Sequence, residues 1–387
     1  MTAGTQNATP KTQFISVDDH AQEHPRVWTD RLSATRWGDR IPHTVERSDG
    51  SEFWVVDGVP LQLRGVSAAA AAMPDRLKEP PRWEGVPRVA YDPSERILAM
   101  DRDGVAASVL YPTVSGLAGE AFGRLTDPEL ELACVQAYND WLIDEWVNVS
   151  GRFIPQCIVP LQPVSAIVAE IERTVERGHR GVIFPSIPMH LRDVPHLNEP
   201  GYDPVWATCE ALGVPLCMHA GASPRVMFPV HAGLSAARAD ALRAVTGPAS
   251  TVFGLTNMLL SRILTRFPRL NVIFAESGLG WSAFFLEYAD HQFEQDRIPQ
   301  EGYELTPSQL FKQQCYFVGW YDAVAGPARH VGADRILWSS NFPLATSTWP
   351  ESQATIARCF RDVPADQKNK ILWRNAAALY GVESGRV

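Results

Sequence analysis

The sequence predicts a (β/α)8 TIM barrel, because short apolar runs recur along the chain and helical segments lie between them. Eight runs are typical of buried strands, and they cover residues 13–19, 106–112, 152–161, 180–186, 214–219, 270–276, 314–320 and 335–340. A doubly wound sheet more often has about five to seven strands. The length of 387 residues also fits a single barrel of about 250 residues with insertions.

Segments with helical periodicity separate several of these runs, and the clearest cover residues 127–147, 163–178, 202–213 and 251–268. Each such helix can return the chain to the start of another parallel strand. The alternation of apolar runs and helical segments therefore favours eight parallel strands wound into one barrel.

The predicted domain organisation is a flexible tail over residues 1–13, followed by a single barrel domain over residues 14–387. Residues from about 37 to 95 do not fit the repeat. Residues 48–65 read as a small hairpin with Asp-Gly turns, and a Pro-rich loop follows. Active sites of such barrels lie at the carboxyl ends of the strands, so an insertion after the first strand would cover or gate the mouth. A dimer contact is the alternative role.

The composition excludes several classes of function. The chain has 35 Lys and Arg against 44 Asp and Glu, a net charge of −9, which argues against a nucleic-acid or anionic-membrane binder. No run approaches the roughly 18 apolar residues of a membrane span, and the first residues do not form a signal peptide. The six cysteines are scattered without a C-x-x-C pair and read as reduced core thiols. We expect a cytoplasmic protein.

Polar side chains stand at the ends of four of the predicted strands: Asp18, Asp19, His20, His219, Glu276 and Asn341. In a barrel these positions converge on one mouth. Strand alternation places Asp18 and His20 on the same side and Asp19 on the other. Two imidazoles with two carboxylates suit a divalent ion such as Zn²⁺, Fe²⁺ or Mn²⁺. A lone buried His or a helix-capping Asp is the plainer interpretation of each residue, but a converging set would leave buried charge without an ion.

The same residues resemble a known family. The segments V-D-D-H-A-Q-E (17–23), M-H-A-G (218–221), F-A-E-S-G-L-G-W (274–281) and S-S-N-F-P (339–343) are similar to the amidohydrolase-related branch that includes aminocarboxymuconate-semialdehyde decarboxylase and resorcylate-type decarboxylases. Each motif is short, and their order and spacing make the resemblance specific. It extends over nearly the whole chain.

The resemblance implies a metal-dependent barrel enzyme in which Asp18, His20 and His219 bind the ion. Relatives nearest in pattern carry S-D-Y-P-H at the last strand, where this chain has S-N-F-P-L, so Asn341 replaces an acid and Leu344 replaces a histidine. An amide has no useful pKa for proton transfer, and leucine cannot ligate a metal.

Two carboxylates remain as further candidate ligands of the ion. Glu23 is either a ligand or a solvated or helix-capping residue, and Glu276 is either a ligand or a group that contacts the substrate or another ligand. Zinc is the favoured ion, with iron or manganese as alternatives.

Two functions follow from these features. The first is a mononuclear metal enzyme that hydrolyses or decarboxylates a small carboxylate or amide, with Glu276 or Asp18 handling the proton and Asn341 limited to hydrogen bonding or weak ligation. The alternative is a supporting subunit with a degenerate site, paired with a paralogous barrel in a two-metal oxygenase of the 2-aminoisobutyric acid hydroxylase type. The expected partners are a small-molecule substrate and either a second copy of the chain or that paralogue.

Overall fold

The computed structural model describes residues 11–383 except 62, 64, 77, 222–228 and 230. The predicted tail over residues 1–13 therefore lies mostly outside the described residues. Thr12 is held against the body of the protein, since its amide donates to Gln353 Oε1 at 2.8 Å. Within the described residues, no helix is both long and apolar enough to cross a membrane.

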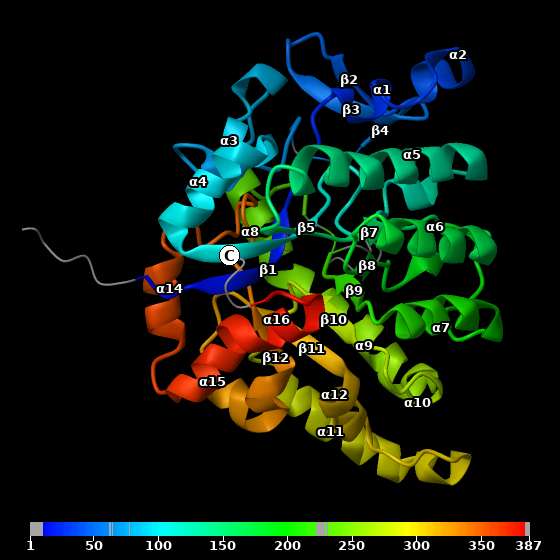
Figure 1. Ribbon diagram of the computed structural model, residues 1–387, viewed down its shortest axis with the longest axis vertical. Helices are drawn as coiled ribbons and strands as arrows, with labels where there is room; N and C mark the ends of the chain where they lie inside the picture. The colour runs from blue at the N-terminus through cyan, green and yellow to red at the C-terminus, as the bar shows by residue number, and fades with distance from the viewer. Residues whose placement is uncertain are drawn as a thin grey trace, which may run out of the picture.

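Parallel strands form the centre of the molecule (Figure 1). Three pair in one sheet, in the order β1 (Phe14–His20), β5 (Val105–Tyr111), β6 (Phe153–Pro155). Six pair in a second sheet, in the order β12 (Ile336–Trp338), β11 (Cys315–Gly319), β10 (Val272–Ala275), β9 (Leu216–His219), β8 (Val182–Ile183), β7 (Cys157–Ile158). All pairs in these two sheets are parallel.

Two junctions close these sheets into a barrel. At one junction β6 runs into β7 with only Gln156 between them, so a single predicted strand changes its partner from β5 to β8. At the other, the backbone after β12 bonds to β1: the Asn341 amide donates to the Asp18 carbonyl at 3.0 Å, and the His20 amide donates to the Phe342 carbonyl at 2.7 Å. Each of the eight predicted runs contains a strand of this ring, which confirms the barrel.

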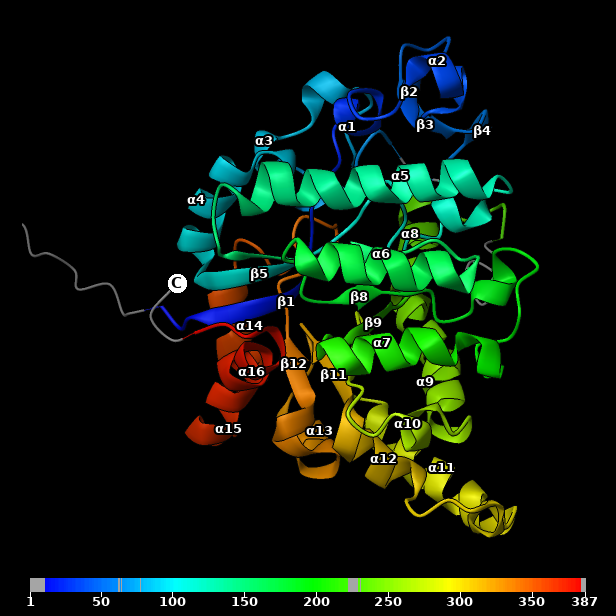
Figure 2. The same cartoon turned by 45° about the vertical axis from the view of Figure 1, so that its right-hand side comes forward.

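Helices surround the strands, and α5, α6 and α7 lie side by side along one flank (Figure 2). The helices of at least eight residues are α4 (Pro93–Asp103), α5 (Pro128–Trp141), α6 (Val164–Glu176), α7 (Asp203–Leu212), α8 (Ala236–Thr246), α9 (Ser250–Leu260), α11 (Ser282–Gln295), α12 (Pro307–Gln314) and α14 (Ser352–Cys359). Shorter helices are α1 (Arg26–Thr29), α2 (Ala34–Trp37), α3 (Arg88–Tyr91), α10 (Ile263–Arg266), α13 (Ala325–Pro327), α15 (Ala365–Asn369) and α16 (Asn375–Tyr380).

Local sequence explains where these helices begin and end. Asp127 caps α5 by accepting from two amides of its first turn, and Pro128 occupies the first helical position. The predicted helix over 251–268 is interrupted, because Arg262 adopts a left-handed conformation with φ of 62° between α9 and α10. Six fully buried tryptophans contribute to the core: Trp28, Trp54, Trp141, Trp146, Trp206 and Trp338. All six cysteines lie in the described part of the chain and are buried and unpaired.

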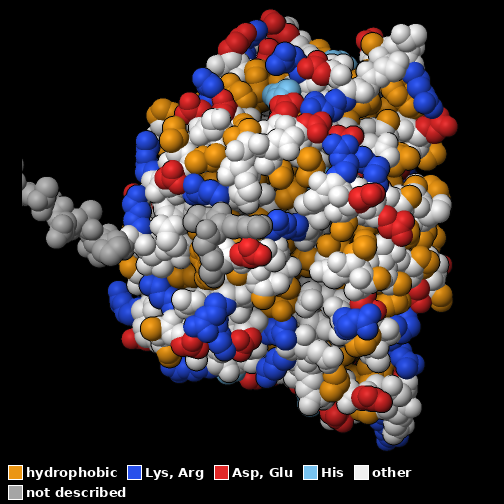
Figure 3. Space-filling model, in the orientation of Figure 1, with side chains coloured by type: hydrophobic (Ala, Val, Ile, Leu, Met, Phe, Trp, Pro, Cys, Tyr) orange, Lys and Arg blue, Asp and Glu red, His pale blue; other side chains and the backbone are white. Residues whose placement is uncertain are grey.

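The segment after β1 forms a separate antiparallel sheet of β2 (His43–Glu46), β3 (Glu52–Val56) and β4 (Val59–Pro60), seen at the top of Figure 1. Asp57 and Gly58, both with positive φ, make the tight turn between β3 and β4 that the Asp-Gly pair predicts. The chain then returns to the barrel, where the Ala71 amide donates to the Pro343 carbonyl. On the face shown in Figure 3, acidic and basic side chains are interspersed.

Candidate metal centre

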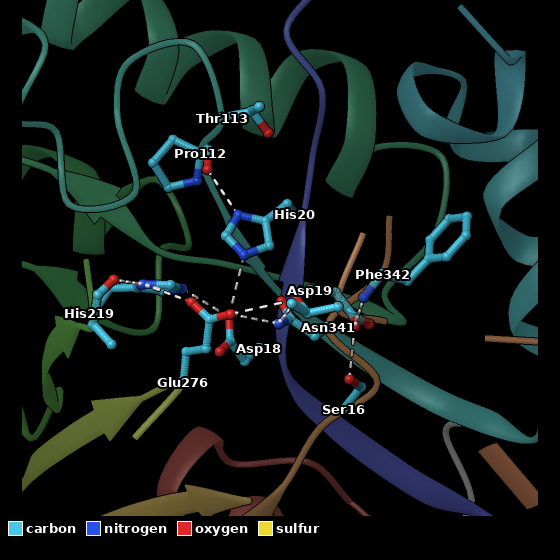
Figure 4. A network of polar contacts seen from close by, with 12 residues as sticks. Ser16, Asp18, Asp19, His20, Pro112, Thr113, His219, Glu276, Asn341 and Phe342 are labelled. Carbon is cyan, nitrogen blue, oxygen red and sulfur yellow. Dashed lines mark hydrogen bonds and ion pairs between the residues drawn. The ribbon is translucent and has the colours of Figure 1, made fainter. Parts of the chain in front are cut away.

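Three predicted ligands meet inside the barrel mouth: Asp18 and His20 from the end of β1, and His219 from the end of β9 (Figure 4). Asp18 Oδ1 lies 3.4 Å from His20 Nε2 and 3.4 Å from His219 Nε2. One potential ligand atom from each residue lies within 4.8 Å of the others. Asp18 and His20 have no exposed surface, and His219 is 2% exposed.

Backbone carbonyls orient both imidazoles. His20 Nδ1 lies 2.8 Å from the Pro112 carbonyl, and His219 Nδ1 lies 2.6 Å from the Ala220 carbonyl. Because a carbonyl can only accept, each Nδ1 carries a hydrogen, and each ring is turned so that its Nε2 faces Asp18. Metal-binding histidines are commonly held in this way by a partner on the other ring nitrogen.

The cluster has the properties of a cation site. In the part of the chain that the structure describes, Asp18 Oδ1 and Oδ2, His20 Nε2 and His219 Nε2 are buried without a hydrogen-bond partner. Leaving such atoms unpaired is costly unless something binds them. Ligand atoms of a tetrahedral zinc site, each about 2.0–2.2 Å from the ion, are about 3.3 Å apart. The two separations from Asp18 Oδ1, both 3.4 Å, match that spacing, and all three ligand atoms lie within 4.8 Å of one another, so the residues fit a divalent ion.

Electrostatics couple the carboxylate to the imidazoles. Burial alone would raise the pKa of Asp18, but the charge of His219 and the contacts with both rings hold it well below its usual range. Burial alone would lower the pKa of His219, but the Asp18 charge raises it to about 9. Without an ion, His219 is therefore protonated at neutral pH, and an incoming cation must displace that proton.

Glu276 and Asn341 lie beside the cluster, and both have left-handed backbones, with φ of 48° and 56°. Asn341 Nδ2 donates to Glu276 Oε1 at 3.0 Å and to Thr346 Oγ1 at 2.8 Å. Glu276 Oε2 faces His219, 3.9 Å from its Nδ1. Burial, together with the Asp18 charge, raises the pKa of Glu276 against the opposing effect of His219. Leu344 is partly buried in the turn after Asn341, where its amide donates to the Asn341 carbonyl.

The structure does not bring Glu23 to this cluster, which corrects its assignment as a ligand. Its carboxylate is fully buried and accepts from the amides of Thr113, Val114 and Ser115 and from the Ser115 hydroxyl. Both of its oxygens are therefore engaged by protein donors. Its place in the chain, three residues after His20, does not reveal that the loop after β5 supplies these donors.

Three residues near the cluster were not identified from the sequence. Thr346 hydrogen-bonds Asn341 from a loop with no recognisable motif. Tyr111 packs against both imidazoles, with ring centroids 5.9 Å from His20 and 5.2 Å from His219. Tyr111 lies near the end of a predicted strand, and this position could have indicated that it lines the barrel mouth. Glu120 lies in the loop after β5, where burial raises its pKa and the charge of His219 opposes that shift.

Comparison with known proteins identifies the family. The family model described as amidohydrolase matches residues 53–382. Gamma-resorcylate decarboxylase from Rhizobium radiobacter is 24% identical over 269 residues, which cover 64% of this chain and 76% of that protein.

Solved structures share the fold. An amidohydrolase from Mycobacterium avium subsp. paratuberculosis superposes with a TM-score of 0.76 at 20% identity, covering 96% of this chain and all of the other. A dihydroxybenzoic acid decarboxylase from Polaromonas sp., with bound manganese and the inhibitor 2-nitroresorcinol, superposes with a TM-score of 0.63 at 20% identity, covering 82% and 94%. The family match spans most of the sequence and includes His219, Glu276 and Asn341, and it confirms the resemblance seen in the motifs. This chain belongs to the amidohydrolase family.

Proposed function

We propose that this chain is a mononuclear divalent-metal enzyme that decarboxylates a small hydroxylated aromatic acid. The observation that carries the proposal is the set of buried, partnerless ligand atoms on Asp18, His20 and His219. The substrate class is taken from relatives, whose names specify resorcylate and dihydroxybenzoate. Hydrolysis of an amide is the other reaction that the same site chemistry allows.

Each residue of the site has a separate proposed role in metal binding, proton transfer or positioning. Asp18, His20 and His219 would hold the ion, which when bound supplies positive charge to fix and polarise substrate oxygens. Decarboxylation breaks the bond between the ring and the carboxyl carbon, CO₂ leaves, and the ring carbon takes up a proton. Glu276 is the proposed proton donor, because Oε1 is held by Asn341 while Oε2 faces the cluster. Asn341 positions Glu276 and transfers no proton itself.

The metal is the second part of the proposal. A set of two imidazoles and a carboxylate suits Zn²⁺, and it also accepts Mn²⁺ and Fe²⁺. We propose zinc as the resident ion. The manganese bound in the dihydroxybenzoic acid decarboxylase makes Mn²⁺ the first alternative.

One observation favours a second function. By the resemblance to the family motif, Asn341 and Leu344 stand where an acid and a histidine are expected, so this mouth has fewer groups for a second ion. A supporting subunit beside a paralogous barrel in a two-metal hydroxylase would keep such a reduced site. In that arrangement the chain forms a hetero-oligomer, whereas an independent enzyme functions alone or as a homo-oligomer.

The proposed domain organisation is a single domain, with residues 37–95 inserted beside the mouth. Contacts of the returning segment support this placement. The Ala68 amide donates to Gln22 Oε1, just after β1, and the Ala71 amide donates to the Pro343 carbonyl, just after β12.

The test uses the purified full chain, loaded separately with Zn²⁺ and Mn²⁺, and a panel of hydroxybenzoic acids and simple amides. The expected result is metal-dependent release of CO₂ from at least one hydroxybenzoate, lost in His219→Ala. No turnover by the loaded chain alone, together with activity when a paralogous barrel is co-expressed, would replace the first function by the second. Release of an amine or ammonia without CO₂ would assign the chain to amide hydrolysis.

A further inference from the structure

Glu23 is a fully buried carboxylate that the proposed chemistry does not use. Its Oε2 accepts from the amides of Thr113 at 3.1 Å and Val114 at 2.8 Å, and its Oε1 accepts from the Ser115 amide at 3.2 Å and the Ser115 hydroxyl at 2.7 Å. Three consecutive backbone amides thus point at one carboxylate. Burial raises the pKa of Glu23, and the hydrogen bonds from Val114 and Ser115 oppose that shift. Four donors on two oxygens hold the loop to this side chain.

The loop that Glu23 holds also orients a proposed metal ligand. Pro112 comes directly before the three amides, and its carbonyl lies 2.8 Å from His20 Nδ1. The two segments are joined further where the Ala21 amide donates to the Tyr111 carbonyl and the Thr113 hydroxyl donates to the Ala21 carbonyl. A continuous series of contacts therefore runs from the Glu23 carboxylate through the loop to the His20 imidazole.

The arrangement requires a hydrogen-bond acceptor at both terminal atoms of residue 23. A glutamine at position 23 would turn an NH₂ group toward backbone amides that can only donate, so at least one amide would lose its acceptor. Since these donors belong to the residues next to Pro112, the loop must shift to relieve that conflict. The Pro112 carbonyl would then no longer fix the hydrogen on His20 Nδ1.

We infer that Glu23 is a positioning residue: its carboxylate holds the loop at residues 112–115, so that the Pro112 carbonyl keeps His20 Nε2 aimed at the metal cluster. The inference rests on the proposed metal site for its consequence, but the link between Glu23 and His20 is present without an ion. Partners on the far nitrogen of a metal-binding histidine typically affect metal affinity about 10- to 100-fold. Glu23 acts one step further away, through the backbone.

The test compares Glu23→Gln with Glu131→Gln in the full chain. Glu131 is a matched control, because it is also fully buried and accepts from a backbone amide, that of Leu161, as well as pairing with Arg192. Zinc affinity is measured by competition with a chromophoric chelator. We expect Glu23→Gln to weaken zinc binding about tenfold, and Glu131→Gln to leave it within about twofold, at comparable losses of thermal stability.

A second readout is independent of the metal. In metal-free protein labelled with ¹⁵N-histidine, the His20 ring nitrogens should report hydrogen on Nδ1 in the wild type and in Glu131→Gln, and a mixture of tautomers in Glu23→Gln. If Glu23→Gln does not fold, Ser115→Ala removes a single donor and should produce a smaller change in the same direction. An unchanged His20 signal and unchanged zinc affinity in the folded variants would overturn the inference. Failure of the wild type to bind zinc would contradict the proposed function alone, since the tautomer measurement would still decide the role of Glu23.

Discussion

Two adjacent aspartates, Asp18 and Asp19, lie on opposite faces of β1 and are used in opposite ways (Figure 4). Both are buried, at 0% and 2% exposure. Asp19 accepts from the hydroxyls of Ser16, Ser108 and Ser340 and from the Phe342 amide. Among the described residues, the polar contacts of Asp18 are with the two imidazoles, each 3.4 Å away, and neither of its oxygens accepts a hydrogen bond.

The difference lies in the donors, because residue type and burial are the same. Asp19 ties β1 to β5 and to the segment after β12, so its bonds help to close the barrel. Asp18 is left with oxygens that nothing in the described structure satisfies. A buried carboxylate with all its donors stabilises the fold, whereas one without them is available for a ligand.

The sharpest test of this contrast is His219→Ala. Removing one of the three ligands should abolish metal binding and lower turnover by at least about a thousandfold, because the ion contributes several kcal/mol of charge stabilisation. Metal per chain and kcat are the measurements. In chelator, the midpoint of thermal unfolding should fall at neutral pH, where His219 pairs with Asp18, and should approach that of the wild type above pH 9. Retained metal at full occupancy would contradict the prediction.

Asp19→Asn should show the reverse pattern. The amide nitrogen would face hydroxyl or amide donors, and we expect the free energy of unfolding to fall by about 3 kcal/mol, measured by denaturant titration. The metal content of the folded fraction should remain that of the wild type. Loss of the ion without loss of stability would show that the two faces of β1 are not separate in function.

The two faces should also differ in their response to pH. The raised pKa of His219, about 9, means that its pairing with Asp18 stabilises the metal-free protein fully below pH 6.5. That contribution is lost as the pH rises through 9. Zinc must displace the same proton, so zinc affinity should rise about tenfold per pH unit from 7 to 9 and then level off. Titration of zinc binding at fixed ionic strength measures this slope, and Asp19→Asn should share it.

The smallest expected effect is that of Asn341→Asp. The new carboxylate would lie about 3 Å from Glu276 Oε1, as the present amide does, and would add negative charge beside the cluster. We expect zinc affinity to increase about tenfold, and the metal-free protein to lose about 1 kcal/mol of stability at neutral pH through repulsion. Asn341→Leu serves as the uncharged control and should not increase affinity.

The sequence predicted the barrel and the positions of the cluster well, for one physical reason. Polar residues toward the carboxyl ends of barrel strands converge on one mouth, and this placed Asp18, His20 and His219 together. The sequence could not predict hydrogen bonds whose partners are brought together by the path of a loop. Glu23 meets donors about 90 residues away in the chain, and Thr346 reaches Asn341 from a loop without a motif. The sequence also could not predict that the strand partner changes from β5 to β8 at Gln156, because β6 and β7 lie in one continuous apolar run.

The most direct test of the central claim is a crystal structure of the zinc-loaded chain with an anomalous difference map. The account predicts one strong peak per chain, bound by Asp18 Oδ1, His20 Nε2 and His219 Nε2, with Glu23 still on the loop amides. The account would be contradicted if the zinc in the crystal lay elsewhere and no peak appeared between Asp18, His20 and His219. It would also be contradicted if the Glu23 carboxylate bound the ion.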